Sequence, residues 1–323
     1  MKRIFNLIVI AGLASQALVV GQGSDASKVL AMVRDALGGD KKLANVKTIA
    51  ASGTSTKVNG DTSGAPGDYE LAIELPDKFM KKEVVATIGQ NAIARTSGFN
   101  GEGVIDATDT PPSFPGQVFV RLGPGGATAG GQVTPEQAEA MRKSALAAAH
   151  EEFARFTLGV FATSFPAFPL EFTYAGQAES PDGKADVIAV KGADDFAAKL
   201  FVDGTTHLPL MLSWMAKEPL RVTSTDGPGG TSTQVVQFGG GHSLTPAERD
   251  QMMKDMQDRM QEADAKRRVV EYRVYYADYQ DVSGIKLPFK IQRSIDGKPS
   301  EQVTLDKIKV NPKIDPKKFE VTK

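Results

Sequence analysis

The stretch VEYRVYYADYQDVSGIKLPFKIQRSI, residues 270–295, decides the fold class. In its first half, apolar or aromatic residues at every second position from Val270 to Tyr276 alternate with Glu271 and Arg273. The second half, from Ile285 onward, alternates apolar residues with polar or basic ones in the same way. A period of two predicts strands with one buried face, and Ser283-Gly284 supplies a turn between them. We therefore expect an antiparallel hairpin here.

The residues that follow extend this sheet. Asp296-Gly297 is a strong hairpin signal and predicts a third strand that ends near Val310. In that strand Val303 and Leu305 have one parity, whereas Ile308 and Val310 have the other. A β-bulge near residues 306–307 would reconcile the two faces.

Strand patterns also occur in the N-terminal half. Alternate apolar residues from Tyr69 to Leu75 predict a half-buried strand, which Pro76-Asp77 ends. The next strand is expected to bury one face that holds four apolar residues: Met80, Val84, Ala86 and Ile88. These patterns indicate one large antiparallel sheet rather than alternating βαβ units.

Three segments have the spacing of amphipathic helices. The first covers about 27–37 and stops at Gly38-Gly39. The second begins with the capping sequence from Thr134 and ends before Pro166. The third runs from about 245 to 268. Between about 107 and 133 the chain is rich in Gly and Pro, and we expect no packed element there.

The first 21 residues resemble a secretory signal peptide. Lys2 and Arg3 precede an apolar run, and small residues follow it. No later segment approaches the ~18 apolar residues of a membrane span. We expect a cleaved leader, one domain over 22–323 with helical insertions at about 105–165 and 226–268, and no stable membrane span. The mature protein would be periplasmic or secreted.

The composition mainly excludes classes of function. The chain has no Cys, which removes disulfides, thiol nucleophiles and Cys-ligated metals. Its formal net charge of -1 lacks the basic excess typical of nucleic-acid binding. We therefore expect no nucleic-acid partner.

The sequence shows no recognisable catalytic motif. His150-Glu151-Glu152 begins like HExxH, but Ala154 stands where the second His would be, and we expect His150 on a charged helix surface. No GxSxG elbow occurs. We assign no catalytic residue, no metal site and no cofactor, and predict that the protein is not an enzyme.

Two apolar stripes flank the Gly-rich segments. One is a Phe series around the second helix, and the other is a Met series on the third helix. Each stripe could be ordinary core or could line a ligand cavity. The two are hard to separate, because a helix that covers a cavity packs on the sheet and contacts the ligand with the same apolar face.

Six segments in order resemble the LolA/LolB-type superfamily, which includes lipoprotein carriers, LppX-like lipid binders and RseB-type sensor domains. They are the helix end Leu37-Gly38-Gly39, LPDKF at 75–79, GFNGEG at 98–103, FVDGTTHLPL at 201–210, YQDVSGIKLP at 279–288 and IKVNPKIDPKKF at 308–319. The resemblance implies a mainly β (α+β) fold, in which a curved antiparallel sheet forms an incomplete barrel. The N-terminal helix and the two helical insertions would cover its concave face.

That resemblance also implies a function. The leading hypothesis is an exported carrier or chaperone that binds lipid or lipoprotein acyl chains in an apolar cavity without catalysis. The candidate cavity residues are Phe153, Phe156, Phe165, Phe168, Leu212, Trp214, Met256, Met260, Phe289 and Ile291. One alternative is a sensor or interaction module that docks on an envelope protein through the Met-rich helix. Another is an envelope hydrolase whose catalytic residues converge only in three dimensions.

Overall fold

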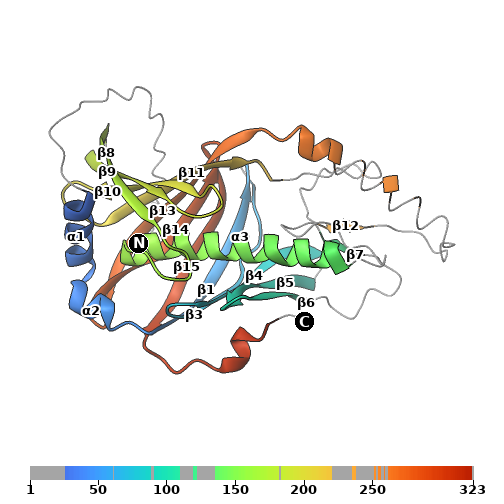
Figure 1. Ribbon diagram of the computed structural model, residues 1–323, viewed down its shortest axis with the longest axis horizontal. Helices are drawn as coiled ribbons and strands as arrows, with labels where there is room; N and C mark the ends of the chain where they lie inside the picture. Colours follow the sequence, from blue (N-terminus) through green and yellow to red (C-terminus); the bar gives the residue numbers. More distant parts are fainter. Residues whose placement is uncertain are drawn as a thin grey trace, which may run out of the picture.

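A curved antiparallel sheet is the main element of the protein (Figure 1). The computed structural model describes residues 26–60, 62–88, 91–109, 119–121, 135–181, 183–219, 235–237, 251, 254–255, 258 and 261–321. The strands of the sheet are β1 (Thr48–Asn59), β2 (Thr62–Ser63), β3 (Gly67–Glu74), β4 (Lys78–Ile88), β5 (Asn91–Asn100), β6 (Gly103–Asp109), β8 (Glu171–Ser180), β9 (Gly183–Lys191), β10 (Ala197–Asp203), β11 (Pro209–Lys217), β13 (Val269–Val282), β14 (Ile285–Ile295) and β15 (Lys298–Val310).

The strand order explains why the sheet is continuous. It runs β6-β5-β4-β3-β1-β15-β14-β13-β11-β10-β9-β8, with β2 beside β1. The pairing of β1 with β15 joins the N-terminal and C-terminal strands. Within the described chain the two end strands, β6 and β8, do not pair with each other, so the barrel is incomplete. The predicted fold class is confirmed.

Turn chemistry fixes the C-terminal hairpins as predicted. Asp296 and Gly297 both have positive φ, 51° and 75°, which a two-residue hairpin turn requires. Ser52 pairs with Lys307 and Gly53 pairs with Leu305, so Asp306 is left over between them. The predicted bulge is therefore confirmed at this residue.

Helices accompany the sheet (Figure 1). Those with defined bounds in the described chain are α1 (Ala26–Leu37), α2 (Asp40–Ala44), α3 (Pro135–Phe161) and the short 3-10 helix η1 (Pro316–Phe319). Gly38 ends α1 with a φ of 135°. A Cβ at Gly38 would overlap the carbonyl oxygen of Gly284, so only glycine allows α1 to approach the β13–β14 turn this closely.

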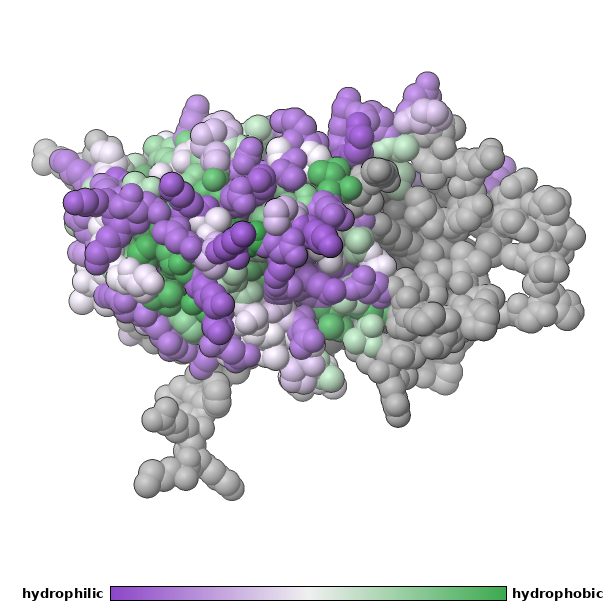
Figure 2. All heavy atoms as spheres, turned by 90° about the horizontal axis from the view of Figure 1, so that it is seen from below, coloured by the Kyte–Doolittle hydropathy of each residue, from purple (hydrophilic) through white to green (hydrophobic). Residues whose placement is uncertain are grey.

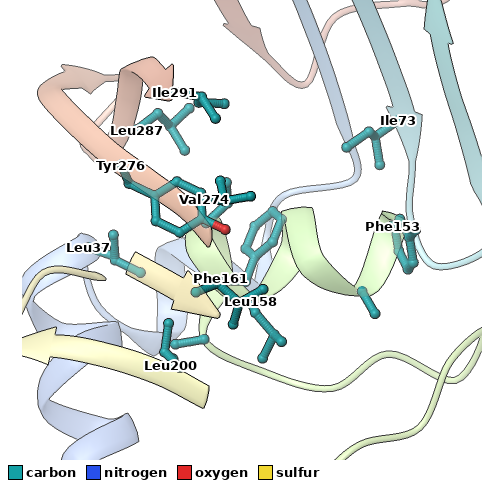
Figure 3. Packing of buried hydrophobic residues seen from close by; sticks show 14 of the residues in the cluster. Leu37, Ile73, Phe153, Leu158, Phe161, Leu200, Val274, Tyr276, Leu287 and Ile291 are labelled. Atoms are coloured by element: carbon teal, nitrogen blue, oxygen red, sulfur yellow. The ribbon is translucent and has the colours of Figure 1, made fainter. Parts of the chain in front are cut away.

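Helix α3 crosses the concave side of the sheet and carries much of the core (Figure 1). Phe153, Leu158 and Phe161 are each at most 2% exposed. Figure 3 shows Leu158 and Phe161 among Leu200 of β10 and Val274 of β13, in one continuous apolar cluster. The first predicted insertion therefore does cover the concave face.

Three expectations need correction. Residues 107–133 include the short strand β7 (Phe119–Arg121), which pairs with β12 (Val235–Gln237) across the two insertions. The predicted common face in β4 fails, because a register shift between Val84 and Ala86 interrupts the alternation. The third helix is described only at isolated residues and at 261–265, so it ends at Ala265 rather than near the expected Arg268.

On the face that Figure 2 shows, the described residues form no extended apolar surface. Figure 2 shows a mostly hydrophilic face, on which apolar side chains form small separate patches among charged ones. In the part of the chain that is described, no helix has both the length and the apolar character needed to cross a membrane. The predicted signal peptide, residues 1–21, lies outside the described residues.

Candidate functional site

A cavity of about 220 Å³ lies between α3 and the concave face of the sheet. Six strands and the middle of α3 supply its walls. The lining residues are Tyr69, Leu71, Phe79, Lys81, Ala148, Glu152, Arg155, Phe156, Trp214, Val274, Tyr276, Ile291, Arg293 and Val303. The described side chains thus leave this space unfilled.

The apolar part of the wall comes from alternate residues of neighbouring strands. Leu71, Val274 and Val303 are at most 5% exposed, so they present a dry surface. A second cavity of about 10 Å³ shares Leu71 and Phe156 with the first. Phe156 of α3 and Leu71 of β3 therefore contact both spaces.

The other part of the wall is ionic. We call Lys57, Lys81, Glu83, Glu152, Arg293 and Glu301 the ionic cluster. Glu152 of α3 accepts hydrogen bonds from Lys81 Nζ at 2.6 Å and from Arg293 Nη2 at 3.2 Å. It therefore ties the helix to β4 on one side and to β14 on the other.

The remaining members of the ionic cluster complete the pairing. Lys81 Nζ lies 2.9 Å from Glu83, and Arg293 Nε lies 3.2 Å from Glu301. Lys57 donates to Glu301 at 2.5 Å and to Glu83 at 2.9 Å. Three cations thus face three carboxylates, which offsets the large desolvation cost of placing charges here.

The electrostatics keep these groups charged. Burial alone would raise the pKa of Glu152, but Lys81 and Arg293 lower it to about 2. Burial alone would lower the pKa of Lys81, but Glu152 and Glu83 reverse the effect and raise it. Burial likewise opposes the charge of Arg293, whose pKa is raised by Glu301 and Glu152. Lys81, Glu152 and Arg293 are therefore ionised at neutral pH.

Arg155 is the cation at the aromatic end of the cavity. Its guanidinium carbon lies 4.4 Å from the centroid of the Trp214 ring and 5.4 Å from that of Phe196. The Trp214 ring in turn stacks on Tyr272, with centroids 5.5 Å apart. Arg155 Nη2 donates to Glu151, whereas its buried Nε has no hydrogen-bond partner in the described structure. Arg155 is thus held in place while one donor is unused.

The ten predicted cavity residues separate into four groups. Phe156, Trp214 and Ile291 line the cavity. Phe153, Phe168 and Leu212 are buried in the main core, and Phe165 and Phe289 pack against it partly buried. Met256 and Met260 lie outside the described residues, so docking through the Met-rich helix stays a prediction.

The charged lining was not predicted from the sequence. A weak signal exists in β4, where Lys81 has the same parity as Phe79, which is 1% exposed. Arg155 lies one helical turn beyond Glu151, which is the spacing of a paired residue on a helix. Neither pattern shows that these side chains face a cavity.

The partial zinc motif has a structural explanation. His150 is partly buried, and its ring meets the ring of Phe99 edge-on at 4.4 Å between centroids. Burial lowers its pKa, opposed by Glu102. The expected exposed position is therefore wrong, because α3 turns this side chain toward β5. Among the residues that the structure describes, no group of His, Asp or Glu could hold a metal ion.

Comparison with known proteins yields only distant structural similarities. No family model matches the chain, and no curated protein matches it. The chain is similar in structure to a LolA superfamily protein from Nitrosomonas europaea, with 10% identity over 92% of this chain and 98% of that one and a TM-score of 0.44. A DUF1329 family protein from Desulfovibrio piger gives 6% identity, the same coverages and a TM-score of 0.44.

A third similar structure is an outer membrane lipoprotein-sorting protein domain from Vibrio parahaemolyticus. It shows 8% identity over 91% of this chain and 97% of that one, with a TM-score of 0.41. The superfamily that the six sequence segments resemble is thus also named among the structural matches, and the case for a function rests on the cavity itself.

Proposed function

We propose that the protein binds lipid or lipoprotein acyl chains in the cavity beneath α3, as a non-catalytic carrier or chaperone of the bacterial envelope. The observation that carries this proposal is an unfilled space of about 220 Å³ with apolar walls on both the helix and the sheet. We also propose that the mature protein is periplasmic or secreted, and this part of the proposal depends on the predicted signal peptide.

The driving force for such binding is apolar burial. Each methylene group moved from water into the cavity contributes about 0.8 kcal/mol. The space is smaller than the ~300–1,000 Å³ of most ligand pockets, so a long chain would need α3 to move outward. The N-terminal half of α3 is the part suited to that movement, since Arg142 and Lys143 are 61% and 76% exposed whereas Leu158 is 0% exposed.

Trp214 offers a direct assay, because it is the only Trp in the sequence and it lines the cavity. We expect acyl ligands to shift its fluorescence emission to the blue and to shield it from quenching by iodide. Native mass spectrometry of protein purified from an envelope fraction should show bound mass that organic extraction removes.

A cavity-filling variant tests whether the ligand occupies this space. Ala148→Phe places a ring into the cavity from α3 and should reduce acyl uptake at least tenfold. Ser144→Phe, one turn earlier at an exposed position, is the matched control and should bind normally. Equal uptake by both variants, or no uptake by the unmodified protein, would contradict the proposal.

A further inference from the structure

We propose that the ligand is a single-chain amphiphile with an anionic head group, and that Arg155 binds this head group. This inference rests on the acyl-binding function proposed above and names the class of ligand. A space of about 220 Å³ suits one chain rather than several.

The charge of the lining favours an anion. Four charged side chains line the cavity, and three of them are the cations Lys81, Arg155 and Arg293. The fourth, Glu152, is already shared between Lys81 and Arg293 at 2.6 Å and 3.2 Å. The carboxylates Glu83, Glu301 and Glu151 that pair with these cations do not line the cavity, so a head group in this space would meet mainly positive charge. An anion is therefore favoured over a cation.

The three cations differ in what they can still bind. Lys81 contacts two carboxylates, Glu152 and Glu83, and Arg293 contacts Glu152 and Glu301. Arg155 has Glu151 as its carboxylate partner, through Nη2. Arginine carries five N–H donors, and the buried Nε atoms of both Arg155 and Arg293 lack a hydrogen bond among the described residues. The Nε of Arg293 nevertheless lies 3.2 Å from Glu301, whereas the described ion pair of Arg155 is made through Nη2. Arg155 is therefore the lining cation whose N–H donors are most available to a ligand.

The surroundings of Arg155 suit recognition of a planar anion. Contacts with the Trp214 and Phe196 rings occupy the guanidinium through its π system and leave N–H groups at its edge for hydrogen bonds. Carboxylates and phosphates bind arginine at that edge, with two parallel hydrogen bonds. Phe156 and Trp214 line the same cavity and offer apolar contact for the first methylene groups of the chain.

The experiment uses ligands that share a twelve-carbon tail and differ in the head group. Dodecanoate, dodecyl phosphate, dodecanol and dodecyltrimethylammonium are titrated into the full chain by isothermal titration calorimetry. We expect at least one of the two anions to bind roughly tenfold to hundredfold tighter than dodecanol, as a charge-assisted hydrogen bond implies. The tighter of the two anions identifies a carboxylate or a phosphate head group.

Two variants then test the role of Arg155. Arg155→Gln should remove the preference for the anion over dodecanol. Arg142→Gln is the matched control, since it removes a positive charge from an exposed position of the same helix, and it should keep the preference. Glu151→Gln removes the competing carboxylate, so it should tighten anion binding and leave dodecanol unaffected.

The outcomes separate this inference from the proposed function. Equal affinity for dodecanol and both anions would overturn the inference and leave acyl binding intact. Absence of binding for all four ligands would remove both. Should Arg155→Gln fail to fold, Glu151→Gln still decides, because unchanged or weaker anion binding by that variant would overturn the role of Arg155.

Discussion

The contact between α3 and the sheet has an apolar side and an ionic side, which are stabilised in opposite ways. Around the C-terminal half of the helix, Leu158 and Phe161 are buried among apolar residues, and burial alone stabilises them. Around the middle of the helix, Lys81 is 6% exposed, and burial alone would destabilise its charge. The apolar side therefore depends on how completely it is packed, whereas the ionic side requires every charged partner to be present.

The largest effect should come from the apolar side. We expect Phe161→Ala to lower the free energy of unfolding by about 3–5 kcal/mol. Phe161 is 2% exposed, so removal of its ring leaves a void in the core. Leu146→Ala, at a partly buried position nearer the N-terminus of α3, should cost less than about 2 kcal/mol. Urea unfolding measures both changes in the free energy of unfolding. Equal losses would show that α3 packs equally tightly along its length.

Removal of one buried cation should have the next largest effect. Lys81→Met leaves Glu83 and Glu152 without their shared partner and should cost about 3 kcal/mol. Adding Glu152→Gln to this variant should recover part of the loss, which a double-mutant cycle in urea would detect. Strictly additive losses would mean that the two residues do not interact.

Acid should weaken the ionic side selectively. In the folded protein the pKa of Glu152 is about 2, below its ordinary value of 4.5. A carboxylate with a depressed pKa contributes stability above pH 5, and that contribution is lost as the pH falls toward 2. We expect a loss of about 2–3 kcal/mol over this interval that Glu152→Gln lacks. Identical pH profiles for the two proteins would contradict the assignment.

A close approach between helix and sheet gives a smaller effect. A Cβ at Gly159 of α3 would overlap the ring of Tyr276 in β13. Gly159→Ala should therefore cost about 1–2 kcal/mol, although Ala favours helix. Tyr276→Leu should reduce that cost, as thermal melts of the single and double variants would show. A stabilised Gly159→Ala protein would indicate that α3 moves away from β13 freely.

The smallest effect concerns the neighbour of Lys81 on the opposite face of β4. Lys82 donates to Asp109 at 2.7 Å, but both side chains are exposed, at 42% and 63%. Lys82→Met should change the free energy of unfolding by at most about 0.5 kcal/mol. A loss comparable with that of Lys81→Met would show that burial does not separate the two faces of this strand.

The sheet and α3 could be predicted from the sequence because alternation, turn residues and helix caps are local signals. The ionic side could not, because its pairs join distant strands whose register depends on irregular positions. A two-residue turn at Asp296-Gly297 would place Arg293 opposite Ser300, but a register shift after Arg293 places it opposite Glu301 instead. Phe79 and Met80 are both buried, so alternation in β4 does not show which face meets α3.

The open edges of the sheet have a mechanical consequence. In a closed barrel, strand number and stagger fix the circumference, so the interior cannot widen without breaking hydrogen bonds between strands. Here β6 and β8 end the sheet without pairing to each other in the described chain. We therefore expect that a change in the curvature of the sheet could enlarge the space beneath α3 without breaking hydrogen bonds between its strands.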